Sequence, residues 1–236
     1  MKTIIHKADT RGLANYGWLE TRYTFSFANY YNPERVHFGT LRVLNDDCIA
    51  GGQGFGKHPN DNMEIITIIR EGELEHQDSM GHTMALKKDE VQVMTAGTGI
   101  FHSEYNRLPD TQLKLFQIWV FPSKKDLKPR YDQKVFDPAE RKNKWQEIVS
   151  PHPNGALLIN QNAWFSLISL EEGKSANYTL KSEGNGIYLF VIEGKINFND
   201  ETFEKRDGIG IWETSSIEIS SLGNSEILLM EIPMVV

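Results

Sequence analysis

The sequence has one cysteine and no long apolar stretch, which argues against a disulfide-bonded secreted protein and against a membrane-spanning one. Cys48 is the only thiol among 236 residues, so an intramolecular disulfide is excluded and a reducing, cytoplasmic setting is the simplest expectation. Because apolar residues follow it in NDDCIAGG, we expect this thiol to be buried and structural. The opening MKTIIHKADT lacks the apolar run of a secretory signal peptide. The sequence contains no run of about 18 apolar residues, so we expect no membrane-spanning helix.

Excess positive charge is also missing. The chain has 25 Lys and Arg against 32 Asp and Glu, a formal net charge of −7. Nucleic-acid binding usually needs a basic face that neutralises phosphates, so we expect no direct nucleic-acid partner. The sequence contains neither a phosphate-binding Gly-Lys-Ser/Thr loop nor a Gly-Xaa-Ser-Xaa-Gly nucleophile elbow. Nucleotide hydrolysis and serine catalysis therefore have no support.

Helical signals are scarce, and short strand-like runs fill the chain instead. EIITIIR, LKLFQIWVF and IYLFVIEGKINF are rich in Ile, Val and Phe and are bounded by Gly, Asn and Asp. This pattern predicts an all-β sandwich or barrel. The best helical signal is DPAERKNKWQEIV, in which Asp137 is a candidate N-cap and Pro138 takes the first helical position. Together with the Lys-rich SKKDLKPRYD before it, this region is interpreted as the connection between two halves.

The two halves share a weak internal repeat. A strand-like run reaches Glu71-Gly72 and a second run leaves it, and the same arrangement recurs around Glu193-Gly194. Matched hairpins in the same order indicate a duplicated β-domain. We therefore expect an N-terminal domain over residues 1–130, a connecting segment over 131–150 and a C-terminal domain over 151–236.

Histidines are confined to one part of the chain. Five of the seven lie between residues 37 and 102, and none follows His152. His58 shares the parity of Asn60, Asn62 and Glu64, and His102 shares that of Glu104, so on extended strands each set points to one face. If the two strands are neighbours in a barrel, two imidazoles and a carboxylate meet, which suits a divalent transition metal such as the iron of non-haem oxygenases.

At these residues the sequence resembles a known family. Gly52, His58-Pro59-Asn60, Glu64 and Gly72 resemble the first cupin motif, and GTG followed by His102 and Asn106 resembles the second. AGTGIFHSE is similar to the version found in the pirin family, and so are GWL, TFSFANYY and EHQDSMG in the same half. The resemblance implies two cupin barrels in tandem, of the double-stranded β-helix or jelly-roll type, with metal in the N-terminal one.

The resemblance also implies a ligand set. By position the ligands would be His58, Asn60, His102 and Glu104, with Fe(II) as the first choice and Mn, Ni, Co, Cu or Zn as alternatives. Asn60 departs from the family pattern, in which this ligand is normally His, and an amide oxygen is a weaker ligand than imidazole. Three outcomes stay open. The other three ligands hold the metal alone, Glu64 supplies a fourth, or the site is empty. If Glu64 is not a ligand, we expect its carboxylate to orient a ligand imidazole.

Three functions follow from these alternatives. Some pirins cleave the flavonol quercetin with dioxygen, so the first is a monomeric quercetin 2,3-dioxygenase-type enzyme, with a flavonol-like substrate and Glu104 as the base that takes its hydroxyl proton. The second is a metal- or redox-responsive regulatory protein, and the third is a degenerate cupin. His76 and His82 are expected to be structural or solvated.

Overall fold

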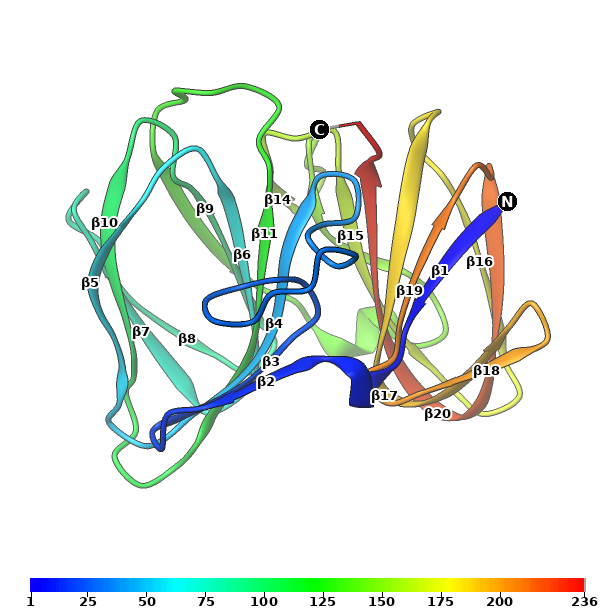
Figure 1. The fold of residues 1–236 in the computed structure, drawn as a ribbon, viewed down its shortest axis with the longest axis horizontal. Coiled ribbons are helices and arrows are strands. Elements are labelled where there is room, and N and C mark those ends of the chain that lie inside the picture. Colours follow the sequence, from blue (N-terminus) through cyan, green and yellow to red (C-terminus); the bar gives the residue numbers. More distant parts are fainter. Residues whose placement is uncertain (236) are drawn as a thin grey trace.

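The computed structural model describes residues 1–235, and they form two β-domains that lie side by side (Figure 1). The N-terminal barrel is closed by two sheets. The larger contains, in spatial order, β12 (Arg130–Val135), β9 (Glu90–Thr95), β6 (Glu64–Glu71), β11 (Leu113–Val120), β4 (Leu41–Ile49), β3 (Leu19–Tyr23) and β2 (Gly12–Asn15). The smaller contains β5 (Gly54–Asn60), β10 (Ile100–Asn106), β7 (Glu73–Asp78) and β8 (Thr83–Lys87).

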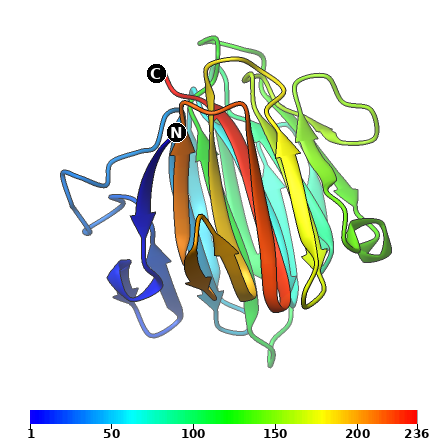
Figure 2. The ribbon, with the colours of Figure 1, turned by 90° about the vertical axis from the view of Figure 1, so that its right-hand side faces the viewer.

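The C-terminal barrel is a single nine-stranded sheet, seen from its own side in Figure 2. Its main path runs β1 (Lys2–His6), β19 (Gly208–Trp212), β17 (Asn185–Phe198), β20 (Ser216–Pro233), β15 (Trp164–Leu170), β13 (Gln146–Ser150) and β14 (Leu157–Leu158). Two further strands, β16 (Ser175–Thr179) and β18 (Glu201–Glu204), pair with β20 and β17. The prediction of an all-β protein with two barrels is confirmed.

The first strand of the chain lies in the second barrel. β1 pairs antiparallel with β19, so residues 2–6 complete the C-terminal sheet before the chain enters the N-terminal barrel. At the other end, β12 pairs with β9 and extends the N-terminal sheet beyond residue 130. No sequence pattern indicates that β1 and β12 pair with these particular sheets. The predicted domain boundaries at residues 130 and 150 stay a prediction.

The two Glu-Gly sites of the repeat have the same backbone conformation. Gly72 has a φ of 83° and Gly194 a φ of 86°, in the left-handed region that glycine adopts without a Cβ penalty. Gly72 turns the chain from β6 into β7, whereas Gly194 bends the continuous strand β17, whose register shifts at that point. A glycine with positive φ thus allows the backbone to change direction at the corresponding position in each half.

The largest hydrophobic cluster lies between the two domains. Phe116 and Ile118 on β11 belong to it together with Phe190 and Leu228 from the C-terminal sheet, and the rings of Phe116 and Phe190 meet edge to face with centroids 5.4 Å apart. Burying each such side chain stabilises the fold by about 1.5–3 kcal/mol. Strand alternation sends the other face of β11, with Leu113 and Leu115, into the N-terminal barrel.

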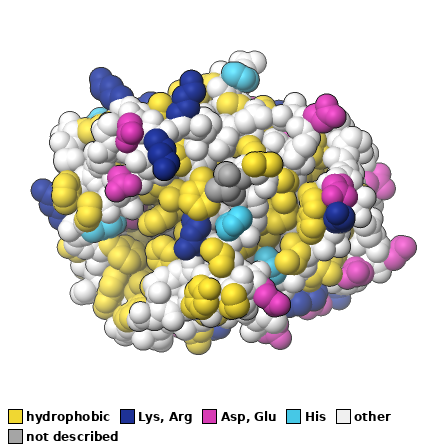
Figure 3. All heavy atoms as spheres, turned by 45° about the horizontal axis from the view of Figure 1, so that its top comes forward, with side chains coloured by type: hydrophobic (Ala, Val, Ile, Leu, Met, Phe, Trp, Pro, Cys, Tyr) yellow, Lys and Arg dark blue, Asp and Glu magenta, His cyan; other side chains and the backbone are white. Residues whose placement is uncertain are grey.

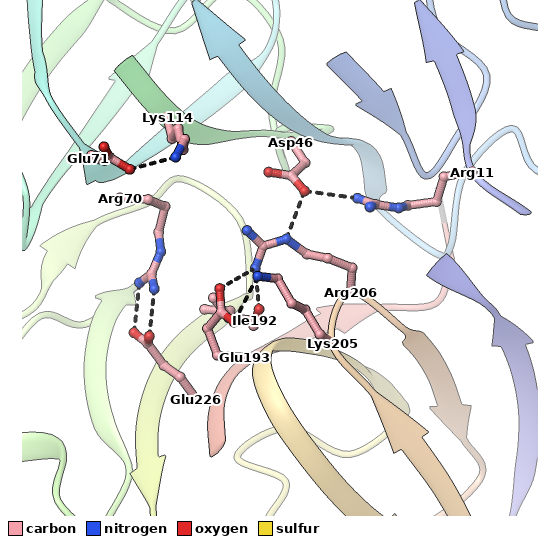
Figure 4. A network of polar contacts seen from close by, with 10 residues as sticks. All are labelled: Arg11, Asp46, Arg70, Glu71, Lys114, Ile192, Glu193, Lys205, Arg206 and Glu226. Atoms are coloured by element: carbon pink, nitrogen blue, oxygen red, sulfur yellow. Dashed lines mark hydrogen bonds and ion pairs between the residues drawn. The ribbon is translucent and has the colours of Figure 1, made fainter. Parts of the chain in front are cut away.

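A polar network joins the domains beside this cluster (Figure 4). Arg70 on β6 donates two hydrogen bonds to Glu226 on β20, at 2.7 and 2.6 Å. Burial alone would raise the pKa of Glu226, but the hydrogen bonds and the charge of Arg70 outweigh it and lower that pKa. Arg206 donates to Asp46 on β4 at 2.8 Å. The domains are therefore held by both apolar packing and charge-assisted hydrogen bonds.

The two barrel interiors differ in chemistry. Inward positions of β17 are Ile187, Leu189 and Val191, and they belong to a wholly apolar cluster. Buried inward positions of β10 are His102 and Glu104. Most of the C-terminal interior is apolar, and the buried carboxylate of Glu231 accepts a hydrogen bond from the Tyr178 hydroxyl. The expected lack of metal ligands in this domain stays a prediction.

Two local expectations need correction. Asp137 does cap the predicted turn, accepting a hydrogen bond from Ala139 N, but the turn is the 3-10 helix η2 (Pro138–Arg141) and not a longer α-helix. The chain leaves the helix at Lys142, which is extended, turns at Asn143 with a φ of 55°, and continues as β13 from Gln146. Cys48 is half-buried and not fully buried. Neither η2 nor η1 (Ala8–Thr10) approaches the length of a membrane span, and no other helix in residues 1–235 does.

Candidate metal centre

The two histidines singled out by spacing face each other on neighbouring strands. β5 and β10 pair antiparallel, and His58 is the direct partner of His102. Their Nε2 atoms are 2.8 Å apart, and Asn60 Nδ2 lies 3.0 Å from His102 Nε2. The predicted adjacency of the two strands is therefore confirmed, and Asn60 stands beside the histidine pair.

The tautomer of His58 is set by the backbone. Its Nδ1 lies 2.8 Å from the carbonyl oxygen of Gly56, and since a carbonyl only accepts, Nδ1 carries the hydrogen. Its Nε2 is then unprotonated and faces His102 Nε2 at hydrogen-bond distance. Burial first, and then the nearby His58, lowers the pKa of His102 to about 4, so that ring is neutral at pH 7. Neutral imidazoles with converging nitrogens are the form that binds metals.

Glu104 is held from the opposite sheet. It is 2% exposed, and its Oε2 accepts a hydrogen bond of 2.8 Å from Gln117 Nε2 on β11. Gln117 Oε1 in turn accepts one of 3.2 Å from Trp119 Nε1. The second carboxylate oxygen of Glu104, Oε1, is buried without a hydrogen-bond partner. The sequence analysis did not predict a role for Gln117. It is a polar residue at a position of LKLFQIWVF that points into the barrel, and this could have indicated the role.

The donor set fits a divalent transition metal in part. Two nitrogens bonded to one ion at about 2.1 Å and at right angles lie about 3.0 Å apart, close to the 2.8 Å separation seen here. Within residues 1–235, however, no three His, Cys, Asp or Glu side chains converge as a metal-binding group. The imidazole pair is in place, while the carboxylate of Glu104 is turned to Gln117. The assignment of all four ligands thus stays a prediction.

A cavity of about 220 Å³ lies beside these residues. It is small for a ligand pocket, since typical volumes are about 300–1,000 Å³. His58 and Glu104 line it, and Tyr23, Phe27 and Trp119 supply an aromatic wall, with the Phe27 and Trp119 rings edge to face at 5.4 Å. The remaining lining residues are Leu19, Thr21, Asn45, Asp47, Phe55 and Gln117. The cavity therefore combines ring-binding walls with polar groups.

His76 lies closer to the site than its sequence context indicated. It is fully buried, and its ring meets that of His102 edge to face with centroids 5.4 Å apart. Its Nε2 lies 3.2 Å from Asp78 Oδ2, and its ring stacks on Tyr131 at 4.5 Å. His82 also contacts Asp78, at 2.8 Å, with its side chain 40% exposed. These residues form a packed layer behind His102, and the period-2 spacing of His76 and Asp78 was the signal for it.

Glu64 does not join the site, so its expected roles as a fourth ligand or as an orienting carboxylate are wrong. Its carboxylate accepts hydrogen bonds from Thr95 Oγ1 at 3.2 Å and from Asn160 N at 3.1 Å. Glu64 does not point to the same face as His58, because the chain turns at Asn62, with a φ of 44°, and enters a different sheet at Glu64. Glu64 instead ties the N-terminal barrel to Asn160 of the C-terminal domain.

Two tandem β-barrels, the first with a histidine pair of which His58 lines a cavity and the second with a largely apolar interior, define a two-domain cupin. A family model described as Pirin matches residues 6–120, and one described as quercetinase C-terminal cupin domain matches residues 147–232. The chain belongs to the pirin family.

Full-length relatives support this assignment. The quercetin 2,3-dioxygenase of Escherichia coli strain K12 is 41% identical over 230 residues, covering 97% of this chain and 98% of that protein. A putative quercetin 2,3-dioxygenase of Pseudomonas aeruginosa is 43% identical over 226 residues, covering 95% and 97%. The crystal structure of the bacterial pirin YhhW from Escherichia coli, in complex with nickel(II), superimposes with a TM-score of 0.94 at 39% identity, covering 99% of this chain and all of that one.

Proposed function

We propose that this protein binds one divalent transition metal in its N-terminal barrel and oxygenates a flavonol-like, enolised aromatic substrate with dioxygen. The observation that carries the proposal is the pair of Nε2 atoms of His58 and His102, 2.8 Å apart beside a cavity that Glu104 also lines. The relatives named quercetin 2,3-dioxygenase support the reaction class.

The metal would be held by His58, His102 and Glu104, with Asn60 beside them. Fe(II) is the first choice from the donor set, and the nickel(II) complex of a relative supports a broader choice of divalent ions. When bound, such an ion supplies Lewis-acid stabilisation of the substrate enolate and a place for dioxygen chemistry.

The protein's own residues would bind and deprotonate the substrate. The aromatic wall of Tyr23, Phe27 and Trp119 holds a flat ring and keeps water away from it. Glu104 has one oxygen without a partner, and this oxygen is placed to take the hydroxyl proton as a general base. Gln117 holds the other oxygen in this structure, and the carboxylate would turn from Gln117 when a metal is bound.

Dioxygen consumption tests this function. Protein loaded with Fe(II) or Ni(II) is mixed with quercetin in an oxygen-electrode cell, and consumption should depend on both the ion and the flavonol. The matched control is His152→Ala, which removes a histidine from the loop that precedes β14 in the C-terminal domain. His102→Ala should abolish the flavonol-dependent rate and His152→Ala should leave it unchanged. No rate above that of the free ion with any of the metals would overturn the proposal.

A further inference from the structure

The wall of the cavity that belongs to the larger sheet carries two polar side chains with no assigned role. On β4, Leu44 faces the interdomain core, whereas Asn45 and Asp47 line the cavity. Asn45 is 3% exposed and Asp47 is 5% exposed. Both enter the cavity from the seven-stranded sheet, while His58 enters it from the four-stranded one.

These side chains present oxygens without a well-formed hydrogen bond, although the Thr21 hydroxyl lies near Asp47. Asn45 Oδ1 and Asp47 Oδ1 are buried without a hydrogen-bond partner, and so is Glu104 Oε1 on the same cavity. Burial, together with the charges of Asp46 and Glu104, raises the pKa of Asp47 to about 7, and the nearby Thr21 opposes this only in part. Buried acceptors left unpaired are costly, and native proteins keep few of them. A ligand that brings hydrogen-bond donors would remove this cost.

We propose that Asn45 and Asp47 form a hydroxyl-binding subsite that accepts hydrogen bonds from ring hydroxyls of the substrate and thereby selects polyhydroxylated aromatics. This inference rests on the proposed function and names the substrate feature that the same site recognises. A ring without hydroxyls at this wall fills the same space but leaves both acceptors unpaired. Sites built to bond a hydroxyl discriminate strongly against analogues that lack it.

The test compares two flavonols by isothermal titration calorimetry under nitrogen, so that no turnover occurs. Quercetin carries further ring hydroxyls, and 3-hydroxyflavone shares its ring system and 3-hydroxyl but lacks the others. The metal-loaded native protein should bind quercetin roughly tenfold more tightly or better, since one unpaired buried acceptor already costs on that order. Equal affinities for the two flavonols would overturn the subsite.

Variants assign the discrimination to these residues. Asp47→Leu and Asn45→Leu keep the number and branching of the side-chain heavy atoms and remove the acceptors, so each should reduce the ratio of quercetin to 3-hydroxyflavone affinity several-fold. Thr67→Val is the control, since Thr67 is buried in the same barrel but does not line the cavity. Both Leu variants are measured, so that if one does not fold the other still gives a ratio of quercetin to 3-hydroxyflavone affinity. An unchanged ratio in a folded variant would overturn the assignment.

The outcome is separable from that of the oxygenase proposal. A quercetin preference that depends on Asp47, in a protein that consumes no dioxygen, supports the subsite and overturns the oxygenase. Dioxygen consumption at equal rates and affinities for both flavonols supports the oxygenase and overturns the subsite.

Discussion

His58 and His102 are directly opposed partners on β5 and β10, with their Nε2 atoms 2.8 Å apart. The carbonyl of Gly56 fixes the proton of His58 on Nδ1, and burial keeps His102 neutral. The strands therefore direct two imidazole nitrogens to one point. This relationship is the basis of the metal proposal.

Removing single histidines should separate ligands from their neighbours. His102→Ala removes one of the two opposed nitrogens, so we expect metal content after dialysis to fall to background. His82→Ala, at a side chain 40% exposed, should leave metal content unchanged. His76→Ala removes the ring packed against His102 and should weaken affinity about tenfold, as partners that orient a ligand typically do. Elemental analysis measures all three, and equal loss in the three variants would mean that the ligands are wrongly assigned.

Asn60→His should strengthen the site. Asn60 Nδ2 already lies 3.0 Å from His102 Nε2, so an imidazole at this position would add a strong ligand next to the existing pair. Metal affinity should rise by about 10- to 100-fold, and the melting temperature should rise with metal because the ion binds only the folded state. Differential scanning fluorimetry with and without Ni(II) measures the second effect, with Asn62→His as the control at the turn before β6. An unchanged metal-dependent shift would show that residue 60 does not reach the ion.

The interdomain pair should contribute measurably to stability. The Arg70 and Glu226 side chains are 17% and 18% exposed and share two hydrogen bonds. Arg70→Met would remove both bonds and leave the partly buried carboxylate only the weaker contact with Arg141 at 3.8 Å. We expect a loss of roughly 2–3 kcal/mol in the free energy of unfolding, below the 3–5 kcal/mol of fully buried pairs. Urea unfolding measures this. The exposed pair Lys144 and Glu140 gives the control, because Lys144→Met should cost less than about 1 kcal/mol. Equal effects of the two substitutions would contradict the structural role of the buried pair.

Stability should depend on pH through His6. Burial first, and then the charge of Arg35, lowers the pKa of His6 to about 4, whereas an unfolded histidine titrates near 6.5. Between these values the unfolded state binds more protons, so stability is full above pH 6.5 and falls as the pH drops towards about 4. The loss attributable to this residue is at most about 3 kcal/mol.

The variant His6→Gln isolates this effect, because Gln does not titrate and its side chain can still bond to the Tyr188 hydroxyl that His6 contacts at 2.8 Å. Urea midpoints from pH 7 to pH 4.5 should fall less steeply in the variant than in the native protein. Parallel pH profiles for the two proteins would show that His6 titrates normally.

Much of the fold and the centre of the site were predictable because both depend on local periodicity. Alternating parity predicted a common face for His58 and Asn60 and another for His102 and Glu104, and clustered histidines marked the barrel that carries them. The rest depends on contacts between residues far apart in sequence. Glu64 bonds Asn160, β1 pairs with β19, and Gln117 reaches Glu104 from another sheet. No spacing rule links such positions, because each arises only when the two sheets and the two domains pack together.

An anomalous difference map tests the central claim most directly. Crystals of the protein grown with Ni(II) or Fe(II) are measured at the absorption edge of that metal. We predict one strong peak in the N-terminal barrel, about 2.1 Å from both His58 Nε2 and His102 Nε2, with the Glu104 carboxylate turned from Gln117 towards it. A map in which the two histidines stay hydrogen-bonded to each other and any peak lies elsewhere would contradict it.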